Sequence, residues 1–331
     1  MTSHFRVLLL FASLAWLLAG CDRAPDVAAT PSSDPPGTVT VAKEDQPRIA
    51  LVMKSLANEF FQTMEDGAKA HQVKHADEYE LIANGSKNET DVTRQVELVE
   101  QMIAQKVDAL VIAPADSKAL APVCKQAVEA GLVMVNIDNR FDAATLKDQG
   151  VKLPFVGPDN RKGAAMVGSV LAGKLARGDE VAIIEGAPNA FNGIQRKLGF
   201  EDAMKAGGLK VVASQSGHWE TDQANKVAAA LLTAHPKLKG LLCANDNMAL
   251  GAVAAVKAAG KHGKVWIVGF DHLTAVQELL RDGTILATAD QHADQLAVYG
   301  IEYALEMLRT KATPADKETP VELISAPGRV H

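Results

Sequence analysis

Cysteine is scarce in this chain, which has three among its 331 residues. No Cys and His residues are grouped at the spacing of a metal site, so the sequence offers no candidate metal centre. Two of the cysteines, Cys124 and Cys243, fall in a predicted helix and a predicted buried strand of different halves of the chain. An oxidising compartment would permit a disulfide between them, but their placement favours two separate buried thiols.

Basic residues are also in deficit, with 34 Lys and Arg against 40 Asp and Glu and a formal net charge of −6. A protein that binds nucleic acid needs a basic face to meet the phosphates. A protein that docks on anionic lipids by electrostatics needs one too. The composition therefore argues against both kinds of partner.

The short motifs of common enzymes are missing. The sequence has no Gly-x-x-x-x-Gly-Lys-Ser/Thr loop, no Gly-x-Gly-x-x-Gly after a strand, no Gly-x-Ser-x-Gly elbow and no His-Glu-x-x-His pair. We therefore expect a protein that is not an enzyme and that uses no cofactor and no metal.

The N-terminus has the features of an export signal. An apolar run from Val7 to Leu18 has about the length of a signal peptide and is too short to span a bilayer. It ends in Leu-Ala-Gly-Cys21, which resembles a bacterial lipobox. We therefore predict a lipoprotein signal peptide over residues 1–21 and lipidation of Cys21, the alternative being an ordinary cleavage site beside a chance Cys. The following Asp22 resembles the signal that retains Gram-negative lipoproteins in the inner membrane.

Residues 22–46 are rich in Pro, Ala, Ser, Thr and Asp and have no hydrophobic period, which predicts a flexible linker. From Pro47 onward, apolar runs alternate with helical patterns. Strands are predicted at 49–53, 81–83, 109–112, 132–137, 155–157, 181–184, 211–213, 240–243, 265–268, 286–289 and 321–324. Helices are predicted at 60–75, 92–103, 119–130, 163–175 and 296–309, with others between the later strands.

This alternation predicts the α/β class, with parallel sheets and right-handed crossovers. The strands are too numerous for one comfortable sheet, so we expect two doubly wound domains. Ligands of such sheets lie beyond the carboxyl ends of the strands. Polar residues that follow strands are therefore candidates for a site, and they are Asn58, Asp138, Asn139, Asn245, Asp246, Asp271 and Gln291.

Several stretches share one pattern with a known family. They are Lys54–Phe61, Val133–Asp138, Gly157–Asn160, Val181–Gly186 followed by Gln195 and Arg196, Val212–Trp219, Cys243–Gly251, Val268–Asp271 and Ala287–Gln291. Together they resemble the periplasmic monosaccharide-binding proteins of the ribose- and allose-binding type. The resemblance implies the type I periplasmic binding protein fold, in which two Rossmann-like domains are joined by a three-strand hinge.

The resemblance also implies a sugar site. Phe60, Phe61 and Trp219 would sandwich the sugar ring, and polar side chains would bond its hydroxyls; these are Asn58, Asp138, Asn139, Arg196, Asn245, Asp271 and Gln291. The sequence departs from the family at Glu59, where Pro is usual, and at Asn139, where Arg or Lys is frequent. Each residue also has a structural alternative, because a Phe on a helix can be core, an Arg can lie on a surface helix, and Asp or Asn after a strand often caps the next helix.

With the hinge crossings expected near 157–159, 291–292 and 321–323, one domain would combine 47–158 with 292–321. The other would combine 159–291 with 322–331. The implied function is to close on a monosaccharide such as ribose, allose, psicose or a related pentose or hexose, and to deliver it as a monomer to an ABC transporter permease. A periplasmic sensor that addresses a chemoreceptor or histidine kinase is the alternative, while a sugar enzyme using Asp138 and Asp271 as acid and base lacks supporting motifs. A sugar-responsive transcription regulator is excluded because the export signal takes the place of its DNA-binding domain.

Overall fold

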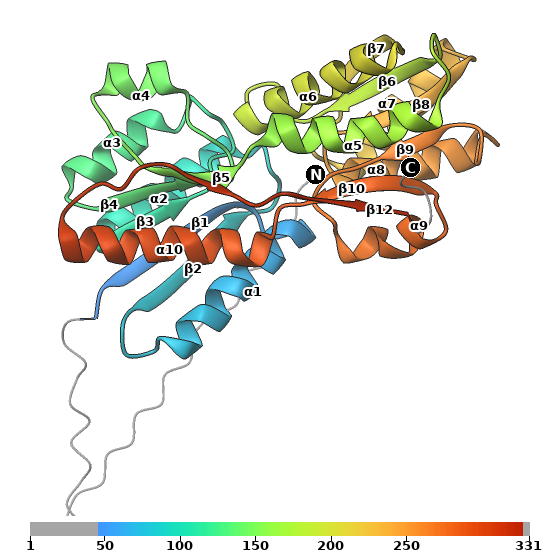
Figure 1. Cartoon of the computed structure of the whole chain (residues 1–331). Coiled ribbons are helices and arrows are strands. Elements are labelled where there is room, and N and C mark those ends of the chain that lie inside the picture. Colours follow the sequence, from blue (N-terminus) through green and yellow to red (C-terminus); the bar gives the residue numbers. More distant parts are fainter. Residues whose placement is uncertain (1–45, 327–331) are drawn as a thin grey trace, which may run out of the picture. The chain divides into compact units, whose positions relative to one another are not determined.

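The computed structural model describes residues 46–326. The predicted signal peptide, the lipidation site Cys21 and the linker as far as residue 45 lie outside the described residues, as do residues 327–331. Within 46–326, strands and helices alternate and build two α/β lobes, each around its own six-stranded sheet (Figure 1). The predicted fold class of two parallel-sheet α/β domains is confirmed.

The first lobe contains the sheet with strand order β11-β5-β4-β3-β1-β2, and its helices are α1 to α4 and α10. Its strands are β1 (Arg48–Ser55), β2 (Glu80–Ser86), β3 (Ala109–Ile112), β4 (Val133–Ile137), β5 (Phe155–Pro158) and β11 (Lys317–Thr319). Its helices are α1 (Glu59–Lys74), α2 (Val92–Ala104), α3 (Ala121–Glu129), α4 (Ala143–Gln149) and α10 (Ala293–Thr310).

The second lobe contains the sheet with strand order β12-β10-β9-β8-β6-β7. Its strands are β6 (Glu180–Glu185), β7 (Lys210–Ser216), β8 (Leu238–Cys243), β9 (Trp266–Val268), β10 (Ile285–Asp290) and β12 (Glu322–Ser325). Its helices are α5 (Asn160–Lys174), α6 (Phe191–Gly207), α7 (Thr221–Ala234), α8 (Asp246–Ala258), the 3-10 turn η1 (Thr274–Val276) and α9 (Gln277–Arg281).

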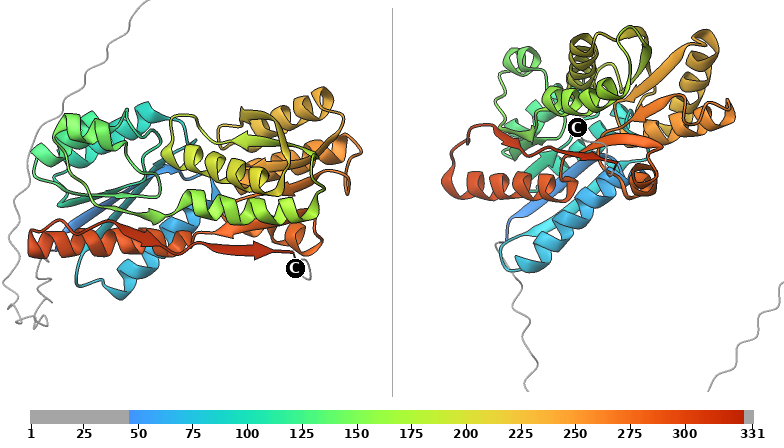
Figure 2. Two further views of the ribbon diagram at one scale, coloured as in Figure 1. Left: turned by 45° about the horizontal axis from the view of Figure 1, so that its top comes forward. Right: turned by 45° about the vertical axis from the view of Figure 1, so that its right-hand side comes forward.

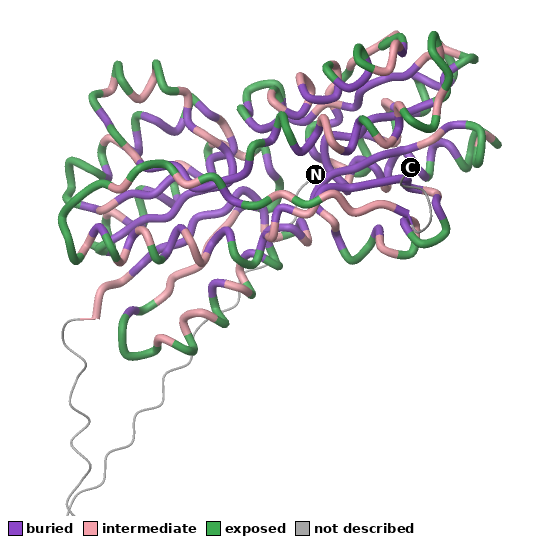
Figure 3. The backbone as a smooth tube through the Cα atoms, viewed as in Figure 1, coloured by how far each residue is buried: buried purple, intermediate pink, exposed green. Residues whose placement is uncertain are grey.

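Strand β1 shows why the apolar runs become central strands. Residues Ile49–Met53 are fully buried. Successive side chains of a strand point to opposite faces, and here Ile49 and Leu51 pack with α1 and α10 while Ala50 and Val52 pack with α2 and α3. Helices cover both faces, which explains why the run Ile49–Met53 is apolar throughout. The buried strands form the interior of each lobe in Figure 3.

The chain passes between the lobes three times, after β5, after β10 and between β11 and β12 (Figures 1 and 2). The third passage explains why β12 is antiparallel to β10 although all the other strand pairs are parallel. β11 runs parallel to β5 and leaves the first sheet at its carboxyl edge. The chain then enters the second sheet from that sheet's carboxyl edge, so β12 must run against β10.

Two elements were not predicted from the sequence. Helix α4 has no buried residue, so it carries no apolar stripe, and its start is fixed by Asp142, whose side chain accepts a hydrogen bond from Thr145 N. Strand β11 is a three-residue edge strand of sequence Lys-Glu-Thr. Edge strands are commonly short and charged, which hides them from a search for apolar runs.

The two described cysteines lie where the sequence placed them. Cys124 is in α3 and Cys243 is in β8, and both thiols are buried and free. This confirms two separate thiols over a disulfide, and burial raises the pKa of Cys124 to about 12. Within residues 46–326, no helix has both the length and the hydropathy of a membrane span, and no group of acidic, His or Cys side chains is arranged to hold a metal ion.

Candidate ligand-binding site

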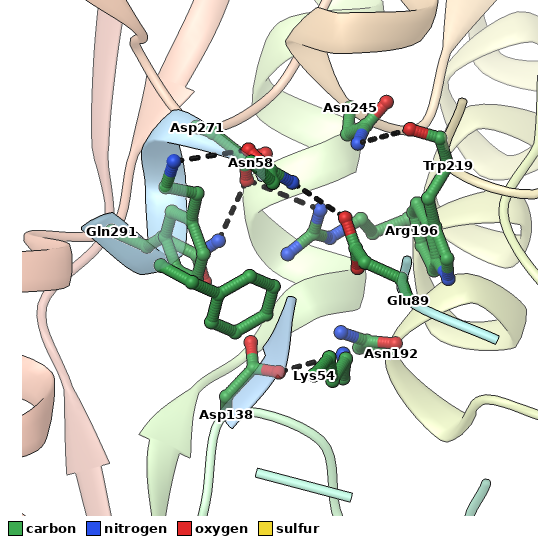
Figure 4. Close-up of a pocket in the computed structure, with 12 residues that line it drawn as sticks. Lys54, Asn58, Glu89, Asp138, Asn192, Arg196, Trp219, Asn245, Asp271 and Gln291 are labelled. Atoms are coloured by element: carbon green, nitrogen blue, oxygen red, sulfur yellow. Dashed lines mark hydrogen bonds and ion pairs between the residues drawn. The ribbon is translucent and has the colours of Figure 1, made fainter. Parts of the chain in front are cut away.

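A pocket lies between the two lobes, at the carboxyl ends of both sheets (Figure 4). Its lining residues are Lys54, Asn58, Phe60, Phe61, Glu89, Asp138, Asn192, Arg196, Trp219, Asn245, Asp271 and Gln291. The structure thus brings together every residue predicted to contact the sugar except Asn139, while Asp246, a candidate only by its place after a strand, lies outside the lining. It adds Lys54, Glu89 and Asn192, which the sequence analysis did not select.

Three lining residues are held in an unusual backbone conformation. Asp138, Trp219 and Asp271 have φ of 59°, 70° and 117°, although none of them is glycine. Each such residue costs on the order of 1–3 kcal/mol, and such strain gathers at functional sites. Each of the three follows a strand, so the turn directs its side chain into the space between the lobes rather than along the next helix.

Asp271 is the centre of a buried polar group in the second lobe. Its Oδ1 accepts a hydrogen bond from Gln291 Nε2 at 2.7 Å and lies 3.4 Å from Arg196 Nη1. Arg196 is fixed in turn, because its Nε donates to Asn160 Oδ1 at 2.8 Å and Nη1 donates to the Ala244 carbonyl at 2.9 Å. Burial raises the pKa of Asp271 to about 8, and the neighbouring Arg196 opposes that rise. Asp271 therefore gains from any additional hydrogen-bond donor that enters the pocket.

The first lobe contributes an ion pair. Lys54, near the end of β1, places its Nζ 2.7 Å from Asp138 Oδ2, and both side chains are only 2% exposed. The same Nζ lies 5.7 Å from the centre of the Phe61 ring and 5.9 Å from the Trp219 ring. The ammonium group is therefore positioned between aromatic surfaces of the two lobes.

Glu89 lies in the loop that follows β2 and is 5% exposed. Its Oε1 accepts a hydrogen bond from Asn58 Nδ2 at 2.5 Å. Burial raises the pKa of Glu89 to about 8, while Lys54 and the bond from Asn58 lower it. The pocket thus holds three carboxyl groups and two cationic side chains, arranged in three separate buried groups of hydrogen bonds and ion pairs.

Aromatic rings form the apolar surfaces. Phe60 and Phe61 meet edge to face, with ring centres 5.1 Å apart and an angle of 84°. From the second lobe, Trp219 lies so close to the backbone of Gly186 that a Cβ there would be 2.1 Å from the indole ring. Glycine at 186 therefore permits the indole to reach the pocket.

Two of the asparagines both cap a helix and line the pocket. Asn58 Oδ1 accepts from Phe60 N at the start of α1, and Asn245 Oδ1 accepts from Met248 N at the start of α8. Their amide nitrogens take no part in the caps. Asn58 Nδ2 donates to Glu89 Oε1, and Asn245 Nδ2 donates to the Trp219 carbonyl. Asp138 and Asp271 do not cap a helix in this way.

Two buried polar atoms of the lining have no protein partner among the described residues, namely Gln291 Oε1 and Trp219 Nε1. A buried polar atom without a partner costs about 1–3 kcal/mol. One of these atoms accepts and the other donates, so a ligand with hydroxyl groups could satisfy both.

Asn139 is the exception among the predicted residues. It is fully buried, and its Nδ2 donates to the Pro114 carbonyl at 2.8 Å while its Oδ1 accepts from Asn192 N at 3.0 Å. These bonds consume the amide, which therefore does not face the pocket. His218, next to Trp219, is exposed.

The three additional residues differ in whether the sequence alone could have identified them. Lys54 directly follows the apolar run Ile49–Met53 of β1, and a lysine in a strand buried on both faces is itself a sign of a buried partner. Glu89 and Asn192 lie in a loop and at the start of α6, where their residue types are ordinary. Only the folded arrangement brings them to the pocket.

Known proteins show clear similarity to this chain. A family model described as a periplasmic binding protein domain matches residues 49–312. A D-ribose/D-allose-binding protein of Pseudomonas aeruginosa is 57% identical over 297 residues, which cover 88% of this chain and 93% of that protein. The D-allose-binding periplasmic protein of Escherichia coli is 32% identical over 84% of this chain and 90% of its own length.

Solved structures agree with these matches. An ABC transporter solute-binding protein of Burkholderia multivorans has 57% identity and a TM-score of 0.84, covering 85% of this chain and 100% of that one. A periplasmic solute-binding protein of Actinobacillus succinogenes with bound D-allose has 38% identity and a TM-score of 0.79, covering 85% and 98%. These relatives are binding proteins of transport systems and not enzymes.

Proposed function

The chain belongs to the periplasmic binding protein family, and from that premise we propose that it captures a monosaccharide of the ribose or allose kind in the pocket between its lobes. A D-ribose/D-allose-binding protein, a D-allose-binding periplasmic protein and a ribose import binding protein are similar to it over most of its length. The bound sugar is then presented to the permease of an ABC transporter.

The observation that carries this proposal is the chemistry of the pocket lining. A pyranose has apolar C–H faces and a polar rim of hydroxyl groups, so its binding needs aromatic surfaces and groups that donate or accept in the plane of the ring. The pocket supplies the rings of Phe60, Phe61 and Trp219 together with carboxylates, amides and a guanidinium. The buried atoms Gln291 Oε1 and Trp219 Nε1, which have no hydrogen-bond partner among the described residues, could bond to the hydroxyl groups of such a ligand.

We further propose that the lobes close over the sugar as two bodies, residues 47–158 with 292–321 and residues 159–291 with 322–331. The lining comes from both lobes, so the full set of contacts exists only when they are together. A ligand that contacts both lobes favours the closed state by its difference in affinity for the two states.

The N-terminal sequence supports an anchored protein on the outer side of the cytoplasmic membrane. We propose that Cys21 is lipidated and becomes the first residue of the mature chain, that Asp22 keeps the protein in the inner membrane, and that residues 22–46 tether the body. The folded body would then act as a monomer beside its permease.

The proposal is tested by thermal melting of the protein against a panel of pentoses, hexoses, ketoses, polyols and amino acids. A ligand at 100 times its dissociation constant stabilises the folded state by about 2.7 kcal/mol, which moves the melting temperature measurably. We expect a shift with D-ribose, D-allose or a close relative. A shift only with amino acids, or with nothing in the panel, would contradict the proposal.

A further inference from the structure

A second set of contacts joins the two lobes outside the sugar pocket. Glu59, the first residue of α1, lies in the first lobe. Its carboxylate accepts hydrogen bonds from Thr274 N at 2.6 Å and Ala275 N at 3.4 Å, at the start of η1 in the second lobe. We call this group of three residues the Glu59 contact.

The loop that receives Glu59 is tied to the pocket. Asp271, which lines the pocket, begins it, and Leu273 follows two residues later. Leu273 belongs to the second lobe by sequence, yet it is 4% exposed and packs in the core cluster of the first lobe with Phe60 and Phe61. On this edge of the pocket, the polar Glu59 contact and the apolar packing of Leu273 therefore both attach the loop to the first lobe.

A comparable group, which we call the Asn139 contact, comprises Ser117 and Asn139 of the first lobe and Asn189, Phe191 and Asn192 of the second. Asn139 Oδ1 accepts from Asn192 N at 3.0 Å, and Ser117 Oγ accepts from Phe191 N at 2.9 Å. Ser117 N also donates to the Asn189 carbonyl at 3.1 Å. The Asn139 amide is fixed within its own lobe by Pro114 and Ser117.

The two contacts share one design. Glu59 directly follows the pocket residue Asn58, and Asn139 directly follows the pocket residue Asp138. Each side chain turns away from the pocket and accepts from a backbone N–H of the opposite lobe. A backbone N–H is the same whichever sugar is bound, so these bonds depend on closure and not on the stereochemistry of the ligand.

We propose that Glu59 and Asn139, with Ser117, are positioning residues that set how readily the lobes close, and that they take no part in choosing among sugars. The proposal rests on the proposed function, because it concerns closure over the same pocket. The observed dissociation constant includes the equilibrium constant of closure as a factor that is the same for every ligand. Removing a hydrogen bond between the lobes should therefore raise the dissociation constant of every sugar by the same factor.

The test is calorimetric titration of the full protein with D-ribose, D-allose and two weaker sugars, for wild type and for Glu59→Ala. We expect each dissociation constant to rise about tenfold, equal to about 1.4 kcal/mol, with the ratios between sugars unchanged and with faster dissociation. Glu59→Gln retains an acceptor oxygen and should lose less. Glu65→Ala removes a carboxylate of the same helix that pairs with Lys69 of its own lobe, and it should bind sugars like the wild type.

Ser117→Ala tests the other edge with the loss of a single hydroxyl group, and it keeps the test informative if Glu59→Ala folds poorly. We expect a smaller uniform loss of affinity there. Wild-type affinity in both Glu59→Ala and Ser117→Ala, or a changed ranking of sugars in Glu59→Ala, would overturn the inference. Failure of the wild type to bind any sugar would instead contradict the proposed function, and small-angle scattering of the ligand-free proteins would then test the contacts, with Glu59→Ala predicted to be more extended.

Discussion

The pocket lining gathers buried ionisable side chains. Glu89, Asp138 and Asp271 supply three carboxyl groups, and Lys54 and Arg196 supply two cations, all enclosed between the lobes. Burying an ion pair costs more than it returns unless hydrogen bonds complete it. A ligand that donates several hydroxyl protons completes such a network, which makes the carboxyl groups the side chains whose loss should cost most.

Asp271 gives the clearest prediction at this scale. Asp271→Ala should raise the dissociation constant for the sugar at least tenfold, because it removes an acceptor and leaves Gln291 and Arg196 without their shared partner. Calorimetric titration measures the effect. Asp222→Ala, an exposed position in the first turn of α7, serves as the control. Wild-type affinity in Asp271→Ala would refute its place in the site.

Substitution of Gly186 tests the role of the Trp219 ring in the pocket. Gly186→Ala places a methyl group where the Trp219 indole lies, since the new Cβ would be 2.1 Å from two ring carbons. We expect the indole to be displaced and the affinity to fall about tenfold, measured by the same titration. The control is Gly173→Ala in α5, where a Cβ meets nothing within 4 Å. That change should leave affinity alone and stabilise the helix by about 0.5–1 kcal/mol.

At the scale of elements, Asp246 links a helix to the sheet below it. It begins α8, is fully buried, and accepts hydrogen bonds from Leu273 N at 3.0 Å and from Thr288 Oγ1 of β10 at 2.9 Å. The side chain lies close to Gly269, where a Cβ would be 1.9 Å from Asp246 Oδ1. One carboxyl group thus fixes helix, loop and strand together.

Burial raises the pKa of Asp246 from 3.8 to about 7. Between these values the folded protein keeps a proton on Asp246 that the unfolded chain releases, so the free energy of unfolding falls as the pH rises from about 4 to 7. Asp246→Asn can still accept from Leu273 N through its oxygen and can donate from Nδ2 to Thr288 Oγ1. The amide does not ionise, so the unfolding free energy of this variant should depend less on pH. Urea unfolding at several pH values measures both slopes, and equal slopes would show that Asp246 does not titrate in this range.

The strands and helices visible in the sequence were those with an apolar pattern. Ile49–Met53 predicts β1 because helices cover both its faces, whereas α4 and β11 bury too little to leave a pattern. The same limit applies to the site. Asp138 and Asp271 could be selected because they follow strands, but Glu89 enters the pocket through a loop whose path no local pattern determines.

Polar residues that follow strands can cap the next helix or bind a ligand, and the sequence pattern is the same for both roles. Asn58 and Asn245 cap their helices and also line the pocket, because an amide has one oxygen for the cap and one nitrogen to spare. For these two positions a helix cap does not argue against a place in the pocket lining, so the sequence could not separate the two interpretations.

At the scale of the whole molecule, three chain passages join two lobes that each have their own core. Few connections and separate cores allow the lobes to move as units. The contacts of Glu59 and Asn139 and the pocket network then determine together how stable the closed state is. We therefore expect changes in the pocket to alter both affinity and selectivity, and changes at Glu59 or Asn139 to alter affinity alone.

The anchor is tested on the full-length chain. Cys21→Ala should abolish lipid attachment, because the thiol that would carry the acyl groups is gone. Metabolic labelling with a radioactive fatty acid and fractionation of expressing cells measure the result, with the wild type as control. Lipid labelling of the variant at the wild-type level would show that Cys21 is not the site.

The most direct test of the central claim is the calorimetric titration of the wild-type protein with D-ribose and D-allose. We predict that at least one of them binds with one molecule per chain and that Asp271→Ala weakens this binding at least tenfold. Absence of heat with both sugars, or binding that is indifferent to Asp271, would contradict the assignment of the pocket between the lobes as a monosaccharide site.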